Sequence, residues 1–241
     1  MKAYLYTIIL KTKLDLKSSE ILITYYLVPL LFFAIMGTVF TSIMPESKET
    51  IIATMTIFSV TMGSLIGTPA SIMEYFKNDL RKSFKSAGIS MQAILLSSLL
   101  SGFFNLTVVS LIIYLISPMA FDALNPENGI LYAGGFVLFL IATLLVGIVL
   151  GLFANNSGQL TVYSQVVFLP SMMLSGIMFP ASMLPEPLQY LGMVFPATHG
   201  MGILGAEVFE YKHFGVLLLF VIISILVIGW KLHQLRYEDA K

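Results

Sequence analysis

Long apolar segments separated by short polar ones dominate the chain. Six of these segments contain no Asp, Glu, Lys or Arg: Ile21–Phe40, Ile51–Met73, Ala93–Ile116, Leu131–Phe153, Val162–Phe179 and Phe214–Trp230. Each is close to the roughly 20 residues that a helix needs to cross the roughly 30 Å hydrocarbon core of a bilayer. The pattern predicts an all-α integral membrane protein with six transmembrane helices, forming a single domain over residues 1–241.

The first twenty residues, Met1–Glu20, mix apolar and basic positions. Tyr4 and Ile8, and likewise Leu5 and Ile9, are spaced four residues apart, and lysines follow them. This spacing places the apolar side chains on one face of a helix. We expect an amphipathic interfacial helix on the inner leaflet. The alternative is a frayed, solvated tail.

A long charged loop, residues 74–90, separates the second and third predicted spans. Phe76, Leu80 and Phe84 recur at intervals of four residues, and Gly88 is placed to end a helix there. A helix held in water has no reason to carry an apolar stripe, so this one predicts contact with a partner surface or with the membrane. The alternative is a basic loop that only fixes orientation.

The segment between the fifth and sixth spans, residues 175–213, is too apolar for an ordinary solvated loop. It contains four prolines, which exclude one continuous helix: Pro180, Pro185, Pro187 and Pro196. Irregular backbone at membrane depth is tolerated only where it is buried in protein or lines a cavity. We therefore expect a re-entrant hairpin of two short helices that dips into the outer leaflet, as the wall or gate of a pathway.

Composition agrees with a lipid environment. Hydrophobic residues make up 57% of the chain and charged residues only 11%, against roughly 25% charged residues in soluble domains. The mean hydropathy is +0.90. The formal net charge is zero, so nothing in the composition indicates nucleic-acid binding.

The basic residues give the predicted orientation. Eleven of the 13 Lys and Arg residues fall in the N-terminal segment, the loop after the second span and the C-terminal tail, and only Lys48 and Lys212 fall on the opposite side. Basic residues accumulate on the cytoplasmic side of membrane proteins. We expect both termini in the cytoplasm, and an even number of spans.

The chain offers no catalytic or metal-binding pattern. It lacks cysteine and a G-x-x-x-x-G-K-[ST] loop, so we expect neither an enzyme nor a cofactor of its own. His199, His213 and His233 are scattered near span ends, where solvated or interfacial histidines are expected. The spans offer hydroxyl, amide, Tyr and Met side chains, which suit an amphipathic cargo better than a bare ion.

Two G-x-x-x-G patterns lie inside predicted spans, at Gly63–Gly67 and Gly147–Gly151. Glycines at this spacing let two helices approach closely. The partner helix belongs either to the same subunit or to a second one, and the pattern does not distinguish these.

The segment after the fifth span carries the most specific motif, S-G-x-x-x-P-x-x-x-L-P followed by a later proline. It consists of Ser175, Gly176, Pro180, Leu184, Pro185 and Pro196. Together with the interfacial helix, the six spans and the charged loop, this motif resembles the permease subunits of ABC-2 type exporters, along the whole chain. Two features depart from that family: an arginine commonly follows the last proline, where this chain reads His199-Gly200-Met201, and the charged loop lacks the form E-x-G-T-x-x-x-L.

The resemblance implies two permease subunits, as a homodimer or a heterodimer, working with separate P-loop ATPase subunits that hold ATP and magnesium. The expected coupling residues are Phe76, Lys77, Leu80, Arg81, Phe84, Lys85 and Gly88. The expected outer gate is the motif itself. The implied activity is ATP-driven export of an amphipathic drug, antibiotic or peptide by alternating access, in a bacterial cytoplasmic membrane. Alternatives are export of a lipid-linked glycan or lipid, a membrane enzyme, and a sensory or structural partner without transport.

Overall fold

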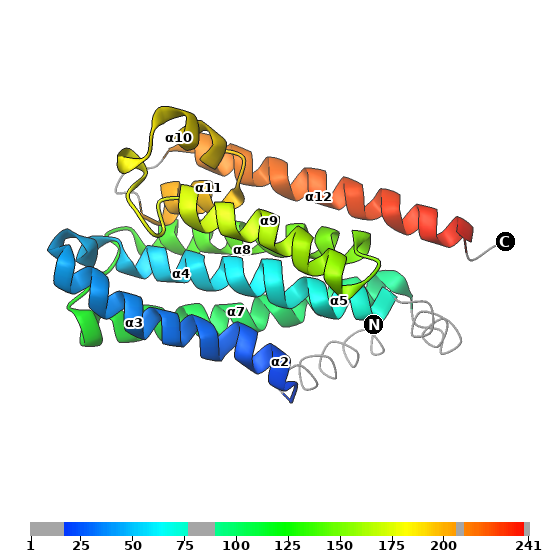
Figure 1. The fold of residues 1–241 in the computed structure, drawn as a ribbon, viewed down its shortest axis with the longest axis horizontal. Helices are drawn as coiled ribbons and strands as arrows, with labels where there is room; N and C mark the ends of the chain where they lie inside the picture. The colour runs from blue at the N-terminus through cyan, green and yellow to red at the C-terminus, as the bar shows by residue number, and fades with distance from the viewer. Residues whose placement is uncertain (1–16, 77–89, 206–209, 239–241) are drawn as a thin grey trace.

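The computed structural model describes residues 17–76, 90–205 and 210–238, and over these residues all regular secondary structure is helical (Figure 1). The elements are α2 Ser19–Leu22, η1 Ile23–Leu27, α3 Val28–Ile43, η2 Pro45–Glu49, α4 Ile51–Met62, η3 Gly63–Gly67, α5 Thr68–Phe76, α7 Met91–Phe121, α8 Gly129–Phe153, α9 Ser157–Leu174, η4 Ala181–Met183, α10 Glu186–Gly192, α11 Pro196–Leu204 and α12 Tyr211–Glu238. The interfacial helix was predicted over residues 1–20, and residues 1–16 of it lie outside the described residues.

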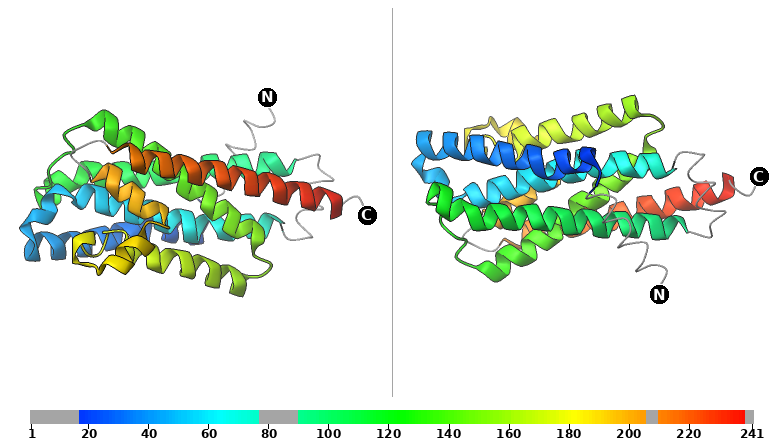
Figure 2. Two further views of the ribbon diagram at one scale, coloured as in Figure 1. Left: turned by 90° about the horizontal axis from the view of Figure 1, so that it is seen from above. Right: turned by 90° about the horizontal axis from the view of Figure 1, so that it is seen from below.

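The long helices run alternately up and down one elongated bundle (Figures 1 and 2). The connections between successive long helices alternate between the two ends of the bundle. The short helices α10 and α11 lie at the end where α3 finishes and α4 begins. We call this the α10–α11 end. Because the direction alternates from α3 through α12, the beginning of α2 and the end of α12 both lie toward the opposite end.

Five helical segments are long and apolar enough to cross a membrane: Ile23–Ile43, Ile51–Phe76, Met91–Phe121, Gly129–Phe153 and Tyr211–Leu235. They confirm five of the predicted spans as helices of suitable length and composition. The remaining long helix, α9, has 18 residues and contains two glutamines and a proline. Its crossing of the membrane, and so the six-span count, stays a prediction.

The predicted fifth span was misplaced by about one turn. It was expected at Val162–Phe179, whereas α9 begins at Ser157 and ends at Leu174. The Asn156 side chain caps its first turn, accepting a 2.9 Å hydrogen bond from the Gln159 amide. At the other end Gly176 has φ +82°, a left-handed conformation that ends the helix.

The continuous segment α4–η3–α5 forms the centre of the bundle. Nearly all side chains of α4 are buried, including hydroxyls at Thr54, Thr56, Ser59 and Thr61. The surrounding helices α3, α7, α8 and α9 therefore turn one face towards α4 and α5 and the other outwards. The outward faces of α3 and α12 are rich in exposed Leu, Ile and Val, as expected where lipid replaces water as the solvent.

Two π-helical turns interrupt these helices, and each ends two residues before a proline. In η1 the Val28 amide bonds to the Ile23 carbonyl, and in η3 the Thr68 amide bonds to the Gly63 carbonyl. Pro29 and Pro69 follow directly. A proline ring clashes with the carbonyl one turn before it, and a widened turn gives the ring room. The hydroxyls of Tyr25 and Thr68, 2.9 Å apart, link the two turns.

The glycine patterns serve packing inside this subunit. A Cβ atom on Gly147 would collide with the Ser64 carbonyl oxygen, and one on Gly151 would lie 2.7 Å from the Pro69 carbonyl oxygen. A Cβ on Gly63 would similarly meet the Leu106 side chain. Since backbone of η3 and α5 occupies the space that a side chain would need, these glycines bring α8 against the central helix.

The segment after α9 contains two short helices, α10 and α11, as expected for a hairpin. The turn Met193–Phe195 joins them, and Pro196 occupies the first turn of α11, where a missing amide proton is harmless. Most of the inner face of α11 is buried against α8 and α12, whereas α10 is largely exposed. Entry of this hairpin into a membrane leaflet stays a prediction.

Candidate functional site

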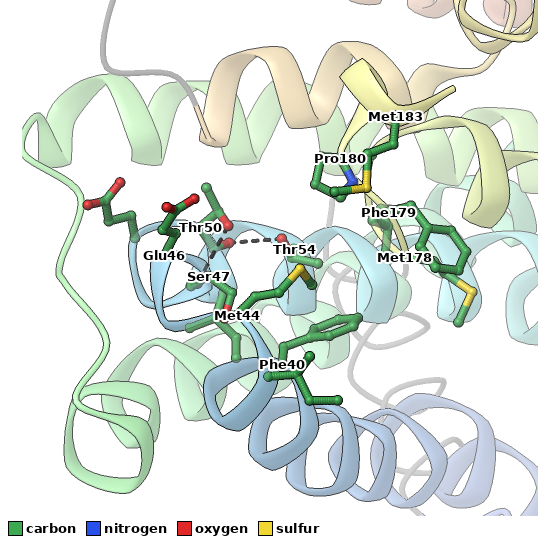
Figure 3. Close-up of a pocket in the computed structure, with 15 residues that line it drawn as sticks. Phe40, Met44, Glu46, Ser47, Thr50, Thr54, Met178, Phe179, Pro180 and Met183 are labelled. Carbon is green, nitrogen blue, oxygen red and sulfur yellow. Dashed lines mark hydrogen bonds between the residues drawn. The ribbon is translucent and has the colours of Figure 1, made fainter. Parts of the chain in front are cut away.

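A pocket of about 590 Å³ opens at the α10–α11 end, between the α3–α4 connection and the turn that follows α9 (Figure 3). Its walls come from four parts of the chain: the last turn of α3, the 3-10 turn η2, the first turn of α4, and residues 176–183. The lining residues are Phe40, Ile43, Met44, Glu46, Ser47, Glu49, Thr50, Ile51, Thr54, Gly176, Ile177, Met178, Phe179, Pro180 and Met183.

The lining combines an apolar wall with two carboxylates. Methionine and phenylalanine side chains come from both sides of the pocket, while Glu46 and Glu49 are exposed on η2. Neither carboxylate forms an ion pair in the part of the chain that the structure describes. The Ser47 hydroxyl is buried there without a hydrogen-bond partner. The arrangement offers an adaptable apolar surface beside negative charge and an unused hydrogen-bonding group.

Local hydrogen bonds and one ion pair hold the η2 side of the pocket. The Thr54 hydroxyl donates to the Thr50 carbonyl at 2.9 Å. Lys48 pairs with Asp122 at 3.3 Å, and the Leu124 amide donates to the Lys48 carbonyl at 3.0 Å. The connection between α7 and α8 thus braces η2 from behind, since neither Asp122 nor Leu124 lines this pocket.

The S-G-x-x-x-P motif forms the other side. Ser175 is buried at the end of α9, and hydrogen bonds join the Thr198 hydroxyl to Ser175 Oγ at 2.9 Å and to the Gly192 carbonyl at 2.6 Å. Thr198 therefore ties α11 to the end of α9. Gly176, with its left-handed backbone, then turns the chain along the pocket, and Pro180 closes the stretch before η4.

The rest of the predicted gate lies near the pocket without lining it. The Leu184 carbonyl accepts a 2.8 Å hydrogen bond from Gln189 Nε2, and Pro185 precedes the first residue of α10. Pro196 is buried at the start of α11. The structure thus brings the predicted residues into one cap, in which Gly176 and Pro180 reach the pocket and the other four hold the short helices.

An aromatic cluster lies one helical turn further along α4 than the pocket residue Thr54. Phe58 of α4 stacks on Phe32 of α3, with ring centroids 3.7 Å apart and planes 10° apart, and meets Phe168 of α9 edge-on at 6.4 Å. Another turn further, the Thr61 hydroxyl is buried and has no hydrogen-bond partner among the described residues. The three rings therefore close the space between α3, α4 and α9 behind the pocket.

A second polar cluster joins α11 to α12. His199 Nδ1 lies 3.0 Å from His213 Nδ1, His199 Nε2 lies 2.9 Å from the Met193 carbonyl oxygen, and His213 Nε2 lies 3.2 Å from Glu210. His199 is only 2% exposed. Burial lowers the pKa of His199; the hydrogen bond to Met193 opposes this, and the charges of His213 and Lys212 add to it.

The expectation that these histidines are merely solvated or interfacial was wrong for His199. Sequence spacing hid the pair, because its members lie 14 residues apart on different helices. Gly202, one turn after His199 on α11, leaves room for the partner ring, since a Cβ atom there would lie 2.5 Å from His213 Nε2. Over the described ranges, no group of three or more His, Cys, Asp or Glu residues could hold a metal ion.

The predicted coupling loop is described only at its edges. Phe76 ends α5 and is half-buried against an apolar cluster that includes Ile72, Leu95 and Leu152. Ser90 caps α7, its hydroxyl accepting a 3.2 Å hydrogen bond from the Ala93 amide. The other expected coupling residues, Lys77, Leu80, Arg81, Phe84, Lys85 and Gly88, lie outside the described residues, so the docking role of the loop stays a prediction.

Comparison with known families gives one match. The family model described as ABC-2 type transporter matches residues 6–209, which is most of the chain. The match spans the bundle from its N-terminal helices through the pocket and α11. A comparison with curated proteins found no match.

Proposed function

Because this chain belongs to the ABC-2 type transporter family, we propose that it is the permease subunit of an ATP-driven exporter in the cytoplasmic membrane. As the membrane domain of an ABC transporter it is a permease and not an ATPase. We further propose that it moves an amphipathic drug, antibiotic or peptide outwards by alternating access. The observation that carries this proposal is the family match together with a pocket that one aromatic cluster closes from behind.

Charge supports an orientation with the α10–α11 end outside. The opposite end is where α5 meets the loop at residues 77–89, which contains four of the basic residues, and where α12 ends near the basic tail. The α10–α11 end carries exposed carboxylates, including those of Glu46, Glu49 and Glu186. Since basic residues favour the cytoplasmic side, the pocket faces outwards in this orientation and both termini face inwards.

Geometry supports a route along α4, between α3 and α9. Thr54, Phe58 and Thr61 lie on one face of α4, because they are separated by four and three residues. Phe58 closes that face with its partners Phe32 and Phe168. In the proposed cycle this aromatic cluster is a closed gate, and separation of α3 from α9 opens it to cargo from the cytoplasm or the inner leaflet. Two permease copies would complete the path.

Energy for the cycle would come from separate P-loop ATPase subunits. A docked helix around Leu80 and Phe84, with its basic rim, would carry ATPase closure to α5 and α7, which flank the loop. A cycle of this kind works because ATP binds the closed ATPase pair more tightly than the open one. In this proposal the chain forms the transport path, and the partner ATPase supplies the free energy for transport. The membrane is that of a bacterium.

The test begins with gentle affinity purification of the chain from its native membrane and mass spectrometry of the proteins that accompany it. We expect a stoichiometric P-loop ATPase, and a second permease if the complex is a heterodimer. The purified complex is then placed in vesicles with the ATPase outwards, and ATP-dependent accumulation of a fluorescent amphipathic dye is measured. An ATPase variant lacking its phosphate-binding lysine is the control. A chain that purifies alone, under conditions that preserve other membrane complexes, contradicts the proposal.

A further inference from the structure

The outer pocket places negative charge beside a flexible apolar wall. Glu46 and Glu49 supply the charge from η2, and Met44, Met178 and Met183 supply much of the wall. We propose that this pocket is a binding site for amphipathic cations, in which the carboxylates hold the cationic group and the methionine wall holds the apolar part. This inference rests on the proposed function and narrows its cargo class.

The charge of the pocket is not cancelled by the lysine of the same turn. Lys48 lies between the two glutamates in sequence, but its ammonium group pairs with Asp122, which does not line the pocket. Within the described ranges, ion pairs join Lys48 to Asp122 and His213 to Glu210, and neither uses Glu46 or Glu49. A cation entering the pocket therefore meets two carboxylates that no described residue neutralises.

Glu49 also lines a second, smaller cavity of about 210 Å³, on the other side of the α4 N-terminus. Glu127 and Tyr132 belong to its lining. Acidic side chains thus line each of these two cavities, and Glu49 belongs to both linings. The larger hollow is the better binding site, because ligand pockets commonly measure about 300–1,000 Å³ and combine apolar walls with a few polar groups.

Methionine side chains are well suited to hold the apolar part of an amphipathic cation. Its unbranched, polarisable side chain adapts to ligands of different shape, and Phe40 and Phe179 add aromatic faces that attract cations. The unpaired Ser47 hydroxyl offers one hydrogen bond as well. Such a lining predicts broad selectivity by charge and size, with little selectivity for a particular chemical group.

Acidic residues near a helix N-terminus have a simpler explanation, since they complement the helix dipole. Glu186, at the start of α10, fits that explanation and lines neither described cavity. Glu46 and Glu49 differ from it because they border an apolar hollow. Glu186 is therefore the matched control, an exposed carboxylate at the same end of the bundle without a pocket beside it.

The first experiment measures direct binding of tetraphenylphosphonium to the purified chain in lipid nanodiscs, without any ATPase. Tetraphenylborate, of similar shape and opposite charge, is the comparison probe. We expect the double substitution Glu46→Gln and Glu49→Gln to weaken binding of the cation about tenfold, because two attractive charges are lost in a partly solvated pocket. Binding of tetraphenylborate should not weaken, and Glu186→Gln should leave both affinities unchanged.

A second experiment uses the absence of cysteine in the chain. Ser47→Cys places one thiol in the pocket, and its reaction rates with cationic and anionic methanethiosulfonate reagents report the local charge. Asn125→Cys, in the smaller cavity, is the positional control. We expect the cation to react faster at position 47, the preference to fall when Glu46 and Glu49 become glutamine, and tetraphenylphosphonium to protect the thiol.

The outcomes separate this inference from the proposed function. Equal binding of the two probes, or no protection of the thiol at position 47, overturns the pocket assignment even if ATP-driven transport is intact. Unchanged affinity for the cation in the variant with both Glu46→Gln and Glu49→Gln also overturns the pocket assignment. If the double substitution instead separates paired subunits, the pocket is a subunit contact and the proposal is wrong. Selective binding without ATP-dependent transport would support the pocket and count against the exporter.

Discussion

His199 Nδ1 lies 3.0 Å from His213 Nδ1, so one hydrogen bond joins α11 to the beginning of α12. The Met193 carbonyl can only accept, so His199 donates from Nε2 and accepts at Nδ1. His213 must then donate from Nδ1. Its Nε2 lies 3.2 Å from the Glu210 carboxylate.

We expect acid to weaken this contact. A proton added to His199 Nδ1 removes the acceptor of the hydrogen bond between the two rings. The pKa of His199 is lowered in the folded protein, so its stabilising neutral form is complete above the unfolded value of about 6.5, and stability is lost as the pH falls from there towards the lower folded pKa. Protection of residues 193–205 against hydrogen exchange, calculated relative to the intrinsic exchange rate at each pH, should therefore fall between neutral and mildly acidic pH.

The matched variant for this prediction is His199→Gln. Its amide can donate to Met193 and accept from His213 but does not titrate in this range. The variant should keep slow exchange at neutral pH and lose the dependence on acid. An acid response that persists unchanged in the variant assigns the effect to another group and refutes the role of the pair.

Gly147→Ala should destabilise the bundle. The added methyl group would collide with the Ser64 carbonyl oxygen, which belongs to the backbone of the central helix and cannot rotate away. Overpacking of this kind costs about 1–3 kcal/mol. Unfolding in detergent, followed by circular dichroism, measures the change. Gly134→Ala in the same helix is the control, because nothing lies within 4 Å of a Cβ atom there, and equal stability of the two variants would contradict the packing argument.

Substitutions at Gly176 should follow the cost of a left-handed backbone. With φ at +82°, Gly should function best, Asn next, and Ala and Leu worst, because a Cβ atom in this region costs about 1–2 kcal/mol and Asn tolerates it better. ATP-dependent dye transport is the measurement. Gly158→Ala, at the start of α9, controls for a general loss of flexibility. Full transport by Gly176→Leu would remove this turn from the gate.

The bundle itself could be predicted because burial in lipid or protein is encoded locally, in uninterrupted apolar runs such as the one within α8. The motif from Ser175 to Pro185 likewise predicted a sharp turn and short helices. Its consequence for α9 was missed, because the predicted span continued through Gly176, whose left-handed φ ends the helix.

The pocket could not be predicted, because its two sides are joined only in three dimensions. Glu46 and Met178 are separated by most of the bundle in sequence, and neither is unusual where it stands. The same holds for the partner of Gly147, since a G-x-x-x-G pattern states that something approaches closely but does not state which helix. Long-range pairing of this kind has no local signature.

The charged loop gives a prediction that depends on sequence alone. Leu80→Asp or Phe84→Asp should abolish ATP-dependent transport while the permease still folds, because a carboxylate on the apolar stripe opposes docking to a partner surface. Co-purification of the ATPase, compared by quantitative mass spectrometry, is the direct measurement. Asn78→Asp adds a carboxylate to the same loop away from the apolar stripe and serves as the control. A variant that retains both ATPase and transport would exclude the stripe as the contact.

Phe58 provides the sharpest test of the route along α4. Its ring is packed between Phe32 and Phe168 and stands one turn behind the pocket residue Thr54. Thr61 is buried in the structure. Phe58→Ala should open the closed state, so that a single cysteine introduced at position 61 reacts with a membrane-impermeant reagent added outside.

Loss of packing alone could also expose position 61, so a second aromatic residue serves as the control. Phe136 of α8 is buried in the same apolar cluster but belongs to neither ring pair of the gate. Phe136→Ala removes a similar area of buried surface, and both truncations should cost about 3–5 kcal/mol. If both variants label position 61 equally, general loosening explains the result. If only Phe58→Ala does so, the aromatic cluster is the barrier between the pocket and the interior.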